Sequence, residues 1–211
     1  MRAARLALAL GLLLSLLPVQ AKAAEDSPFD GFYLGLGGGA GLMSVEASGE
    51  RGGGTKEGQA WQASVFFGSM ARLGPARLGV EFELAAQPLR VDLGQGERLS
   101  LDGFWGARAL IGATPWPTTL VYFAPGARFT TFRHERENFK AGNGDSRLAH
   151  GLSLGAGLEQ VLAQGLLLRL ELCVTRWSDL EVRYLDENYD SSGLILEPTS
   201  YGAALALVYD F

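Results

Sequence analysis

The feature that most restricts the fold of this chain is an alternation with a period of two residues, seen most clearly at residues 199–211. The bulky side chains share one parity, with aromatic rings at both ends: Tyr201, Ala203, Leu205, Leu207, Tyr209 and Phe211. Small residues and one aspartate fill the other parity: Gly202, Ala204, Ala206, Val208 and Asp210. A period of two predicts a strand. A soluble sheet would turn the bulky face inward, whereas a membrane barrel turns it toward lipid.

The first residues have the pattern of a secretory signal peptide. Arg2 and Arg5 precede a continuous apolar run over residues 6–17, which Pro18 ends, and Ala21-Lys22-Ala23 fits an A-x-A cleavage site. The run is too short to span a bilayer as a helix. We therefore expect a signal peptide at residues 1–23 and a mature domain at residues 24–211, with cleavage after Ala21 as the alternative. The single cysteine, Cys173, lies far from this site, so a lipoprotein anchor there is excluded.

Composition narrows the class of the mature domain. Its length suits one domain. Loss of Arg2, Arg5 and Lys22 with the leader changes the formal net charge from −5 to −8, which argues against nucleic-acid binding. The 29 glycines suit many short strands and turns. No second apolar run approaches the length of a membrane-spanning helix, so a membrane location would require a closed barrel.

The same alternation recurs in eight segments, separated by tight turns and longer loops. We expect strands at residues 31–46, 59–70, 77–90, 97–112, 119–133, 147–162, 166–180 and 199–211. Connections are tight after the second, fourth and sixth segments and long after the first, fifth and seventh. Hairpin connections predict antiparallel neighbours. The sequence thus predicts an all-β fold, an eight-stranded antiparallel up-and-down transmembrane β-barrel, with tight turns and termini periplasmic and long loops extracellular.

Some details of these strands can be predicted as well. Pro125 cannot donate to a ladder, so we expect a bulge or local kink in the fifth strand. Parity places Leu99 and Leu101 on the same outward face as Trp105. Three further tryptophans lie near strand ends and are typical of an interfacial aromatic belt: Trp61, Trp116 and Trp177.

The chain resembles the OmpA/OmpX/OmpW-type class of small outer-membrane barrels over its whole mature length. The leader, the eight alternating segments, the loop asymmetry and the final Tyr209-Asp210-Phe211 carry this resemblance. It implies a monomer in the outer membrane of a Gram-negative-type bacterium, in contact with lipid and lipopolysaccharide. It also implies that the barrel-assembly machinery reads Tyr209 and Phe211. Full OmpA-like proteins carry a peptidoglycan-binding domain after the barrel, and we expect this chain to depart from them in having none.

Ionisable residues fall on the expected inner face, well within the strands. They are Glu81, Glu83, Arg108, Arg128, Glu159, Arg169 and Glu171. An eight-stranded barrel is only wide enough to be filled by side chains, so buried charges there must pair. We expect a structural network of ion pairs that plugs the lumen. A gated proton or ion path and an acid–base pair at Glu81 and Glu83 are the alternatives.

Other candidate sites are weaker. His150 falls on the lipid-facing parity, and outer-membrane lipid A deacylases pair such a histidine with a serine two residues later; here that residue is Leu152, and Ser153 faces the other way. Two histidines, His134 and His150, without cysteine or carboxylate spacing do not predict a metal site. Residues 35–40 match a dinucleotide fingerprint but lack the helix that it requires. Cys173 reads as an inert lumen thiol.

We therefore expect a non-enzymatic barrel without cofactor that serves membrane structure or presents surface loops. The acidic, tyrosine-bearing stretch from Tyr184 to Tyr189 is a candidate for an unidentified extracellular ligand. Three alternatives remain open at this point. They are a narrow channel for small or apolar solutes, a lipid A-modifying enzyme, and a soluble periplasmic β-sandwich or lipocalin-like barrel.

Overall fold

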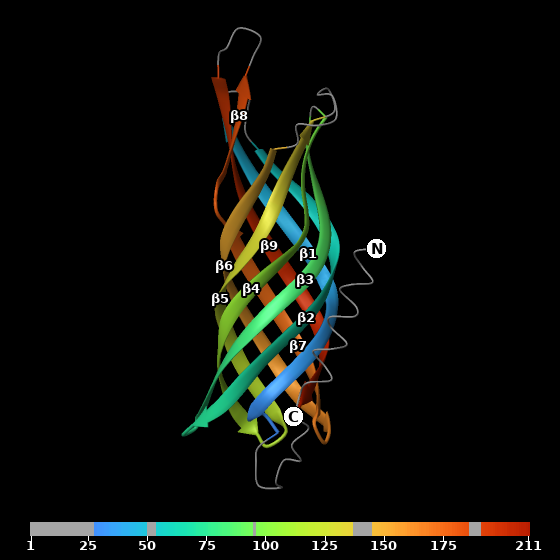
Figure 1. Cartoon of the computed structure of the whole chain (residues 1–211), viewed down its shortest axis with the longest axis vertical. Coiled ribbons are helices and arrows are strands. Elements are labelled where there is room, and N and C mark those ends of the chain that lie inside the picture. Colours follow the sequence, from blue (N-terminus) through green and yellow to red (C-terminus); the bar gives the residue numbers. More distant parts are fainter. Residues whose placement is uncertain (1–27, 50–53, 95, 137–144, 186–190) are drawn as a thin grey trace.

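A computed structural model describes residues 28–49, 54–94, 96–136, 145–185 and 191–211 (Figure 1). The expected signal peptide lies outside these residues. The strands are β1 (Gly31–Gly49), β2 (Gly54–Leu73), β3 (Ala76–Gly94), β4 (Glu97–Trp116), β5 (Thr119–Arg136), β6 (Asp145–Ala163), β7 (Leu166–Trp177), β8 (Leu180–Leu185) and β9 (Ser191–Asp210). Within the described ranges, no helix is both long enough and apolar enough to cross a membrane.

The strands close into one antiparallel barrel. Each strand from β1 to β6 pairs with the next strand along the chain. The barrel is closed by β9, which pairs with both β7 and β1. The strand β8 follows β7 after a break of two residues and continues the pairing with the same partner, β9. Because β7 and β8 act as one interrupted strand, the wall has eight strands in up-and-down order, and the predicted fold class is confirmed.

The strands are longer at one end than the alternation indicated. The stretch 181–198, expected to be the longest loop, instead contains β8 and the first part of β9, paired from Leu180↔Leu196 to Leu185↔Ser191. This hairpin projects beyond the barrel at the top of Figure 1, whereas the tight turns and the C-terminus lie at the lower end. Residues 50–53, 137–144 and 186–190, in the other expected long loops and at this hairpin tip, lie outside the described residues.

The outer face of the barrel carries a continuous apolar band. Large apolar side chains on every long strand are exposed, among them Phe32, Leu36, Phe67, Phe82, Leu84, Phe123, Leu154, Leu172 and Leu205. Exposed charged residues bound this band near the hairpin end, as Arg133 and Arg176 do. A soluble sandwich or lipocalin would bury this face. Exposure of a wide apolar band with aromatic side chains toward its ends is the surface of a transmembrane barrel.

Two of the three predicted belt tryptophans lie on this outer face. Trp61 is 59% exposed and Trp116 is 62% exposed. The prediction for Trp177 is wrong, since this ring lies inside the barrel, 3% exposed, and its Nε1 donates to Ser200 Oγ at 3.1 Å. Trp177 has the same parity as Arg169 and Glu171, which favours the inner face, and its position near a strand end was the weaker of the two signals.

Beyond the apolar band the distribution of polarity is reversed. At the hairpin end the inner face is apolar, with a packed cluster that includes Met43, Val45, Leu89, Val91, Leu99, Leu101, Phe104, Phe132, Trp177, Leu180 and Leu196. The outer face of the same level is charged, as at Arg90 and Asp92 of β3. This part of the wall therefore has an apolar interior and a polar exterior, as a water-soluble barrel does. Such a distribution is expected where the strands extend beyond the bilayer.

A bulge in β4 corrects one predicted face. Leu99 and Leu101 are almost fully buried, whereas Trp105 is 50% exposed, so the three do not share a face. The pairing of β4 with β5 shifts register between Ser100 and Phe104. One extra residue reverses the parity of a strand. Because of the bulge, Leu99 and Leu101 face the barrel interior while Trp105 faces outward into the apolar band. A strictly continuous alternation along β4 does not predict this change of face.

Of the bulge or local kink predicted at Pro125, the bulge is absent. Pairing of β5 with β6 runs through Pro125↔Leu154 without interruption, and the β4 register is the same on both sides of it. Near Pro125, the pairs with β4 lapse between Arg108↔Gly126 and Ile111↔Phe123. The missing N–H of Pro125 therefore removes ladder contacts toward one neighbour without inserting a residue.

Candidate functional site

The seven ionisable residues singled out from the sequence project into the middle of the barrel. They come from five adjacent strands: Glu81 and Glu83 of β3, Arg108 of β4, Arg128 of β5, Glu159 of β6, and Arg169 and Glu171 of β7. Each is at most 9% exposed. They gather because the inner parity of neighbouring strands meets at one level, where the outer parity carries the apolar band.

Five of the seven form one continuous chain of ion pairs. Arg169 contacts Glu159 through Nη2 at 2.5 Å and Glu81 through Nη1 at 2.6 Å. The second carboxylate oxygen of Glu81 accepts from Arg108 Nε at 2.7 Å, and Arg108 Nη1 pairs in turn with Glu171. Both arginines thus bridge two carboxylates, and Glu81 bridges two arginines. Forked contacts of this kind are the strongest ionic hydrogen bonds in proteins.

Two tyrosines complete the coordination of the acids. Tyr33 Oη donates to Glu81 at 2.9 Å, and Tyr122 Oη donates to Glu171 at 2.6 Å. Both rings are buried, and the inner parity of β1 and β5 places them in the lumen. The alternation of the sequence is consistent with both tyrosines on the lumen face, but it does not indicate which acids they bind. Proximity in sequence offered no signal, because the partners lie 48 and 49 residues away.

The remaining two charges form a separate pair nearer the hairpin end. Arg128 Nη2 donates to Glu83 at 2.9 Å, and its Nη1 donates to Thr175 Oγ1 at 3.1 Å. The Cys173 sulfur lies 3.4 Å from the same Nη1, so the lone cysteine is held in a polar contact within the lumen. Gln62 Nε2 approaches Glu83 at 3.5 Å.

Aromatic rings lie against two of the buried arginines, Arg169 and Arg128. The guanidinium of Arg169 lies 4.3 Å from the centroid of Phe66, and that of Arg128 lies 4.3 Å from the centroid of Phe104. Cation–π contacts of this kind strengthen when water is excluded. They give the buried ring of Phe66 on β2 a direct contact with the network.

The network leaves little free volume. The cavity that it lines together with Ser64 and Gly202 has a volume of about 20 Å³. A buried site needs roughly 10–15 Å³ to hold one water molecule. The arrangement therefore fills the lumen at this level with side chains and leaves space for about one water molecule in that cavity.

The other candidates do not assemble into reactive sites. His150 is exposed on the outer face, Leu152 two residues later is 76% exposed, and Ser153 is buried on the inner face. His134 lies in β5 rather than in a loop, with Nε2 at 3.5 Å from Glu97. Among the described residues, no three histidine, cysteine, aspartate or glutamate side chains gather so that they could hold a metal ion. Residues 35–40 lie within β1, with no helix following.

The C-terminal aromatic residues lie at the end opposite the hairpin. Tyr209 is half-exposed on the outer face, and the ring of Phe211 packs edge-on against it with centroids 5.1 Å apart. The Phe211 N–H donates to Phe32 O at 2.9 Å, which holds the last residue against β1. Of the stretch from Tyr184 to Tyr189, residues 186–189 lie outside the described residues.

A closed antiparallel barrel with an apolar exterior and an ion-paired interior is the structure of an integral β-barrel membrane protein, and this chain therefore belongs to that class. The family is equally clear. The chain belongs to the outer membrane protein beta-barrel domain family, whose model matches residues 9–206. No curated protein matches the sequence.

Solved structures share this fold at low sequence identity. OprG from Pseudomonas aeruginosa is 14% identical with a TM-score of 0.58, covering 88% of this chain and 100% of its own. Neisserial surface protein A is 15% identical with a TM-score of 0.48, covering 86% and 98%. The Escherichia coli outer membrane protease OmpT is 9% identical with a TM-score of 0.45, covering 91% and 100%. At these identities the likeness concerns the fold alone.

Proposed function

We propose that this protein is a non-enzymatic, monomeric barrel of the outer membrane with a sealed lumen, which supports the membrane and carries an extracellular β-structure. The observation behind the proposal is the filling of the described interior at three levels. An apolar cluster around Phe29, Met70 and Leu167 lies at the turn end. The ion-pair network occupies the middle, and the apolar cluster around Leu99 and Trp177 closes the hairpin end.

The competing function is a narrow channel for small or apolar solutes. Continuous conduction would require an open path past Arg169 and Arg108, each of which is held by two carboxylates. Purified protein inserted into planar bilayers should therefore give no single-channel steps, and the same protein in vesicles should not admit small polar dyes that the lipid bilayer itself excludes. Discrete conductance steps from protein shown to be folded by its heat-modifiable gel mobility would contradict the proposal.

A lipid A-modifying enzyme is the second competitor. His150 faces the lipid side, but the described residues provide no serine on that face two positions later, since Leu152 occupies it. Mass spectra of lipid A from cells that overproduce the protein should match those from cells without it. A modified lipid A species that disappears with His150→Ala would overturn the non-enzymatic assignment.

The C-terminal pair Tyr209 and Phe211 is proposed as the signal for the barrel-assembly machinery. Deletion of Phe211 removes one edge-on ring contact and one backbone hydrogen bond to Phe32, a small part of the ladder that joins β1 to β9. Refolding into vesicles should therefore be almost unchanged, whereas the amount assembled in the outer membrane of cells should fall severalfold. A parallel loss in both assays would indicate a purely structural role.

A further inference from the structure

The outer face of the barrel has a hollow where the β4 bulge interrupts the wall. It has a volume of about 750 Å³ and crosses β2 to β5. Its floor is made of small residues, Ala63, Ala86 and Gly103, and Ala63 and Ala86 are cross-strand partners. Its volume falls within the range of about 300–1,000 Å³ that is typical of small-molecule sites. We call this hollow the wall groove.

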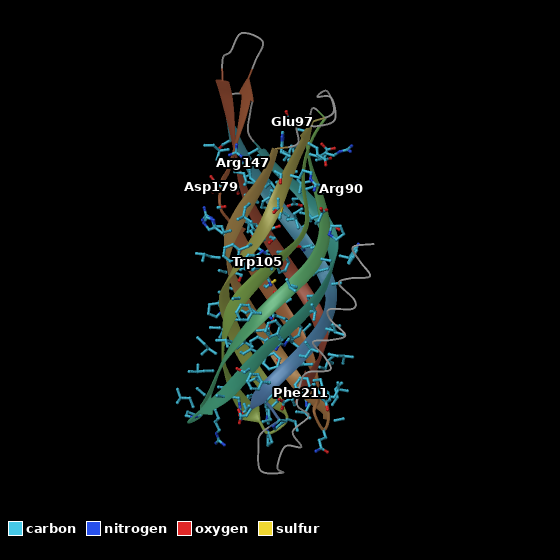
Figure 2. The ribbon with its side chains drawn as sticks, in the orientation of Figure 1. Arg90, Glu97, Trp105, Arg147, Asp179 and Phe211 are labelled. Atoms are coloured by element: carbon cyan, nitrogen blue, oxygen red, sulfur yellow. The ribbon has the colours of Figure 1, made fainter. Side chains whose placement is uncertain are left out.

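The wall groove has an apolar end and a polar end. Leu84, Trp105 and Phe129 line the apolar end, where the Trp105 and Phe129 rings stack with centroids 4.5 Å apart. Asp102 and Arg133 line the polar end, toward the hairpin end of the barrel. In Figure 2, Trp105 lies below Arg90, which marks the same polar level on β3. An amphiphile would therefore lie here with its head toward the hairpin end and its chain along the wall.

The polar end of the wall groove is suited to an anion. Register places Arg90 opposite Ser100 and Ser100 opposite Arg133, so two exposed arginines flank one small residue. At a strand spacing of about 4.8 Å, their backbones are separated by roughly 10 Å. Arg133 pairs with Asp102 at 3.8 Å, and both side chains are more than half exposed. Such a pair is weak, so a phosphate can displace the aspartate at little cost.

From this juxtaposition we propose that the wall groove binds one acyl chain of an outer-leaflet phosphorylated glycolipid, lipopolysaccharide, while Arg133 and Arg90 hold its phosphate. The head-to-hairpin orientation matches a lipid of the outer leaflet if the hairpin end is extracellular. The aromatic wall and the alanine floor match a saturated chain. This site does not depend on whether the lumen conducts or whether the loops bind a ligand.

The test measures binding of purified lipopolysaccharide to the folded protein in a neutral detergent, with phosphatidylglycerol as the comparison lipid. Ala86→Phe fills the floor of the wall groove and should weaken binding of lipopolysaccharide at least about tenfold. Ala203→Phe, at an outward alanine of β9 that does not line the groove, is the matched control and should bind as the native protein does. Heat-modifiable gel mobility verifies that each variant is folded.

The charged end is tested with a second matched pair. Arg133→Gln removes a charge-assisted contact and should weaken binding about tenfold. Arg176→Gln, from a similarly exposed pair with Glu197 at 3.5 Å, should have no effect. Asp102→Asn removes the competing carboxylate and should strengthen binding, which a structural role of the pair would not produce. The proposal is overturned if Ala86→Phe binds like Ala203→Phe, or if phosphatidylglycerol binds as tightly as lipopolysaccharide.

Discussion

At the scale of single residues, Arg169 has the most demanding position in the barrel. It is 2% exposed and contacts two carboxylates, with Phe66 against its guanidinium. A charge in such a place is tolerated only because its partners offset the loss of water. Removing the Arg169 side chain would leave Glu81 paired with Arg108 alone, and Glu159 would lose its ion pair with Arg169.

Replacing Arg169 by methionine keeps much of the volume but removes the charge. We expect the free energy of unfolding to fall by about 3–5 kcal/mol, the cost of leaving a buried partner uncompensated. Urea unfolding in lipid vesicles measures this loss. Arg176→Met is the control, because its pair with Glu197 is exposed and such pairs contribute about 0–1 kcal/mol. Equal losses in the two variants would show that the network does not stabilise the barrel.

Two adjacent glycines of β1 provide a second matched test. A methyl group at Gly39 would lie 2.1 Å from the backbone oxygen of Ala203, whereas at Gly38 its nearest neighbour would be 3.8 Å away. Gly39→Ala must therefore displace the backbone of β9 at the closing seam, and we expect it to cost at least about 1–3 kcal/mol. Gly38→Ala should be neutral or slightly stabilising. Melting of the folded gel band on heating compares the two, and the opposite order would contradict this packing.

At the scale of elements, the sequence predicted the strands well where they cross the apolar band. In that region alternate residues are apolar and polar, as in β3 from Leu78 to Leu84, so the period of two residues is easily recognised. Closure and strand count follow from hairpin connections. The predicted inner positions of Glu81 and Arg169 also follow from parity alone, but which carboxylate meets which arginine depends on the stagger between strands, which no local pattern encodes.

Prediction failed where the strands leave the bilayer. There the interior is apolar and the exterior charged, so the rule that bulky residues face outward misplaces Leu99 and Leu101. The length of β9 was underestimated because its first residues are stabilised by pairing with β8 and β1, at distances of many residues along the chain. The acidic composition of residues 181–198 is typical of a loop. Backbone pairing between distant residues cannot be recognised from composition.

The β8–β9 hairpin is expected to be dispensable for closure of the barrel. Pairing of β9 with β7 and with β1 accounts for the seam below it. Replacing residues 183–193 by Asn-Gly joins Val182 to Leu194 through a tight turn. The variant should fold into vesicles and keep its heat-modifiable mobility. If it failed to fold while Leu180 and Leu196 were retained, the hairpin would have to be counted as part of the structural core.

At the scale of the whole molecule, the same barrel wall faces lipid over the apolar band and water toward the hairpin end. In the membrane the barrel is greasy outside and ion-paired inside, and toward the hairpin end the order is reversed. The bulge in β4 is where one strand changes its parity to suit both, and the wall groove forms at the same place. One alternating sequence thus produces three features. They are the lumen filled with side chains, the apolar band that faces lipid, and the β8–β9 hairpin that projects beyond the barrel.

The most direct test of this description is the environment of the outer face, measured with spin labels in lipid vesicles. Cysteines at Leu205, within the band, and at Arg90, beyond it, would be labelled in a Cys173→Ser background. The label at Leu205 should collide more often with oxygen than with a water-soluble nickel chelate, and the label at Arg90 should show the reverse. Greater access of the nickel chelate at Leu205 would mean that water, not lipid, covers the band, and would contradict the account.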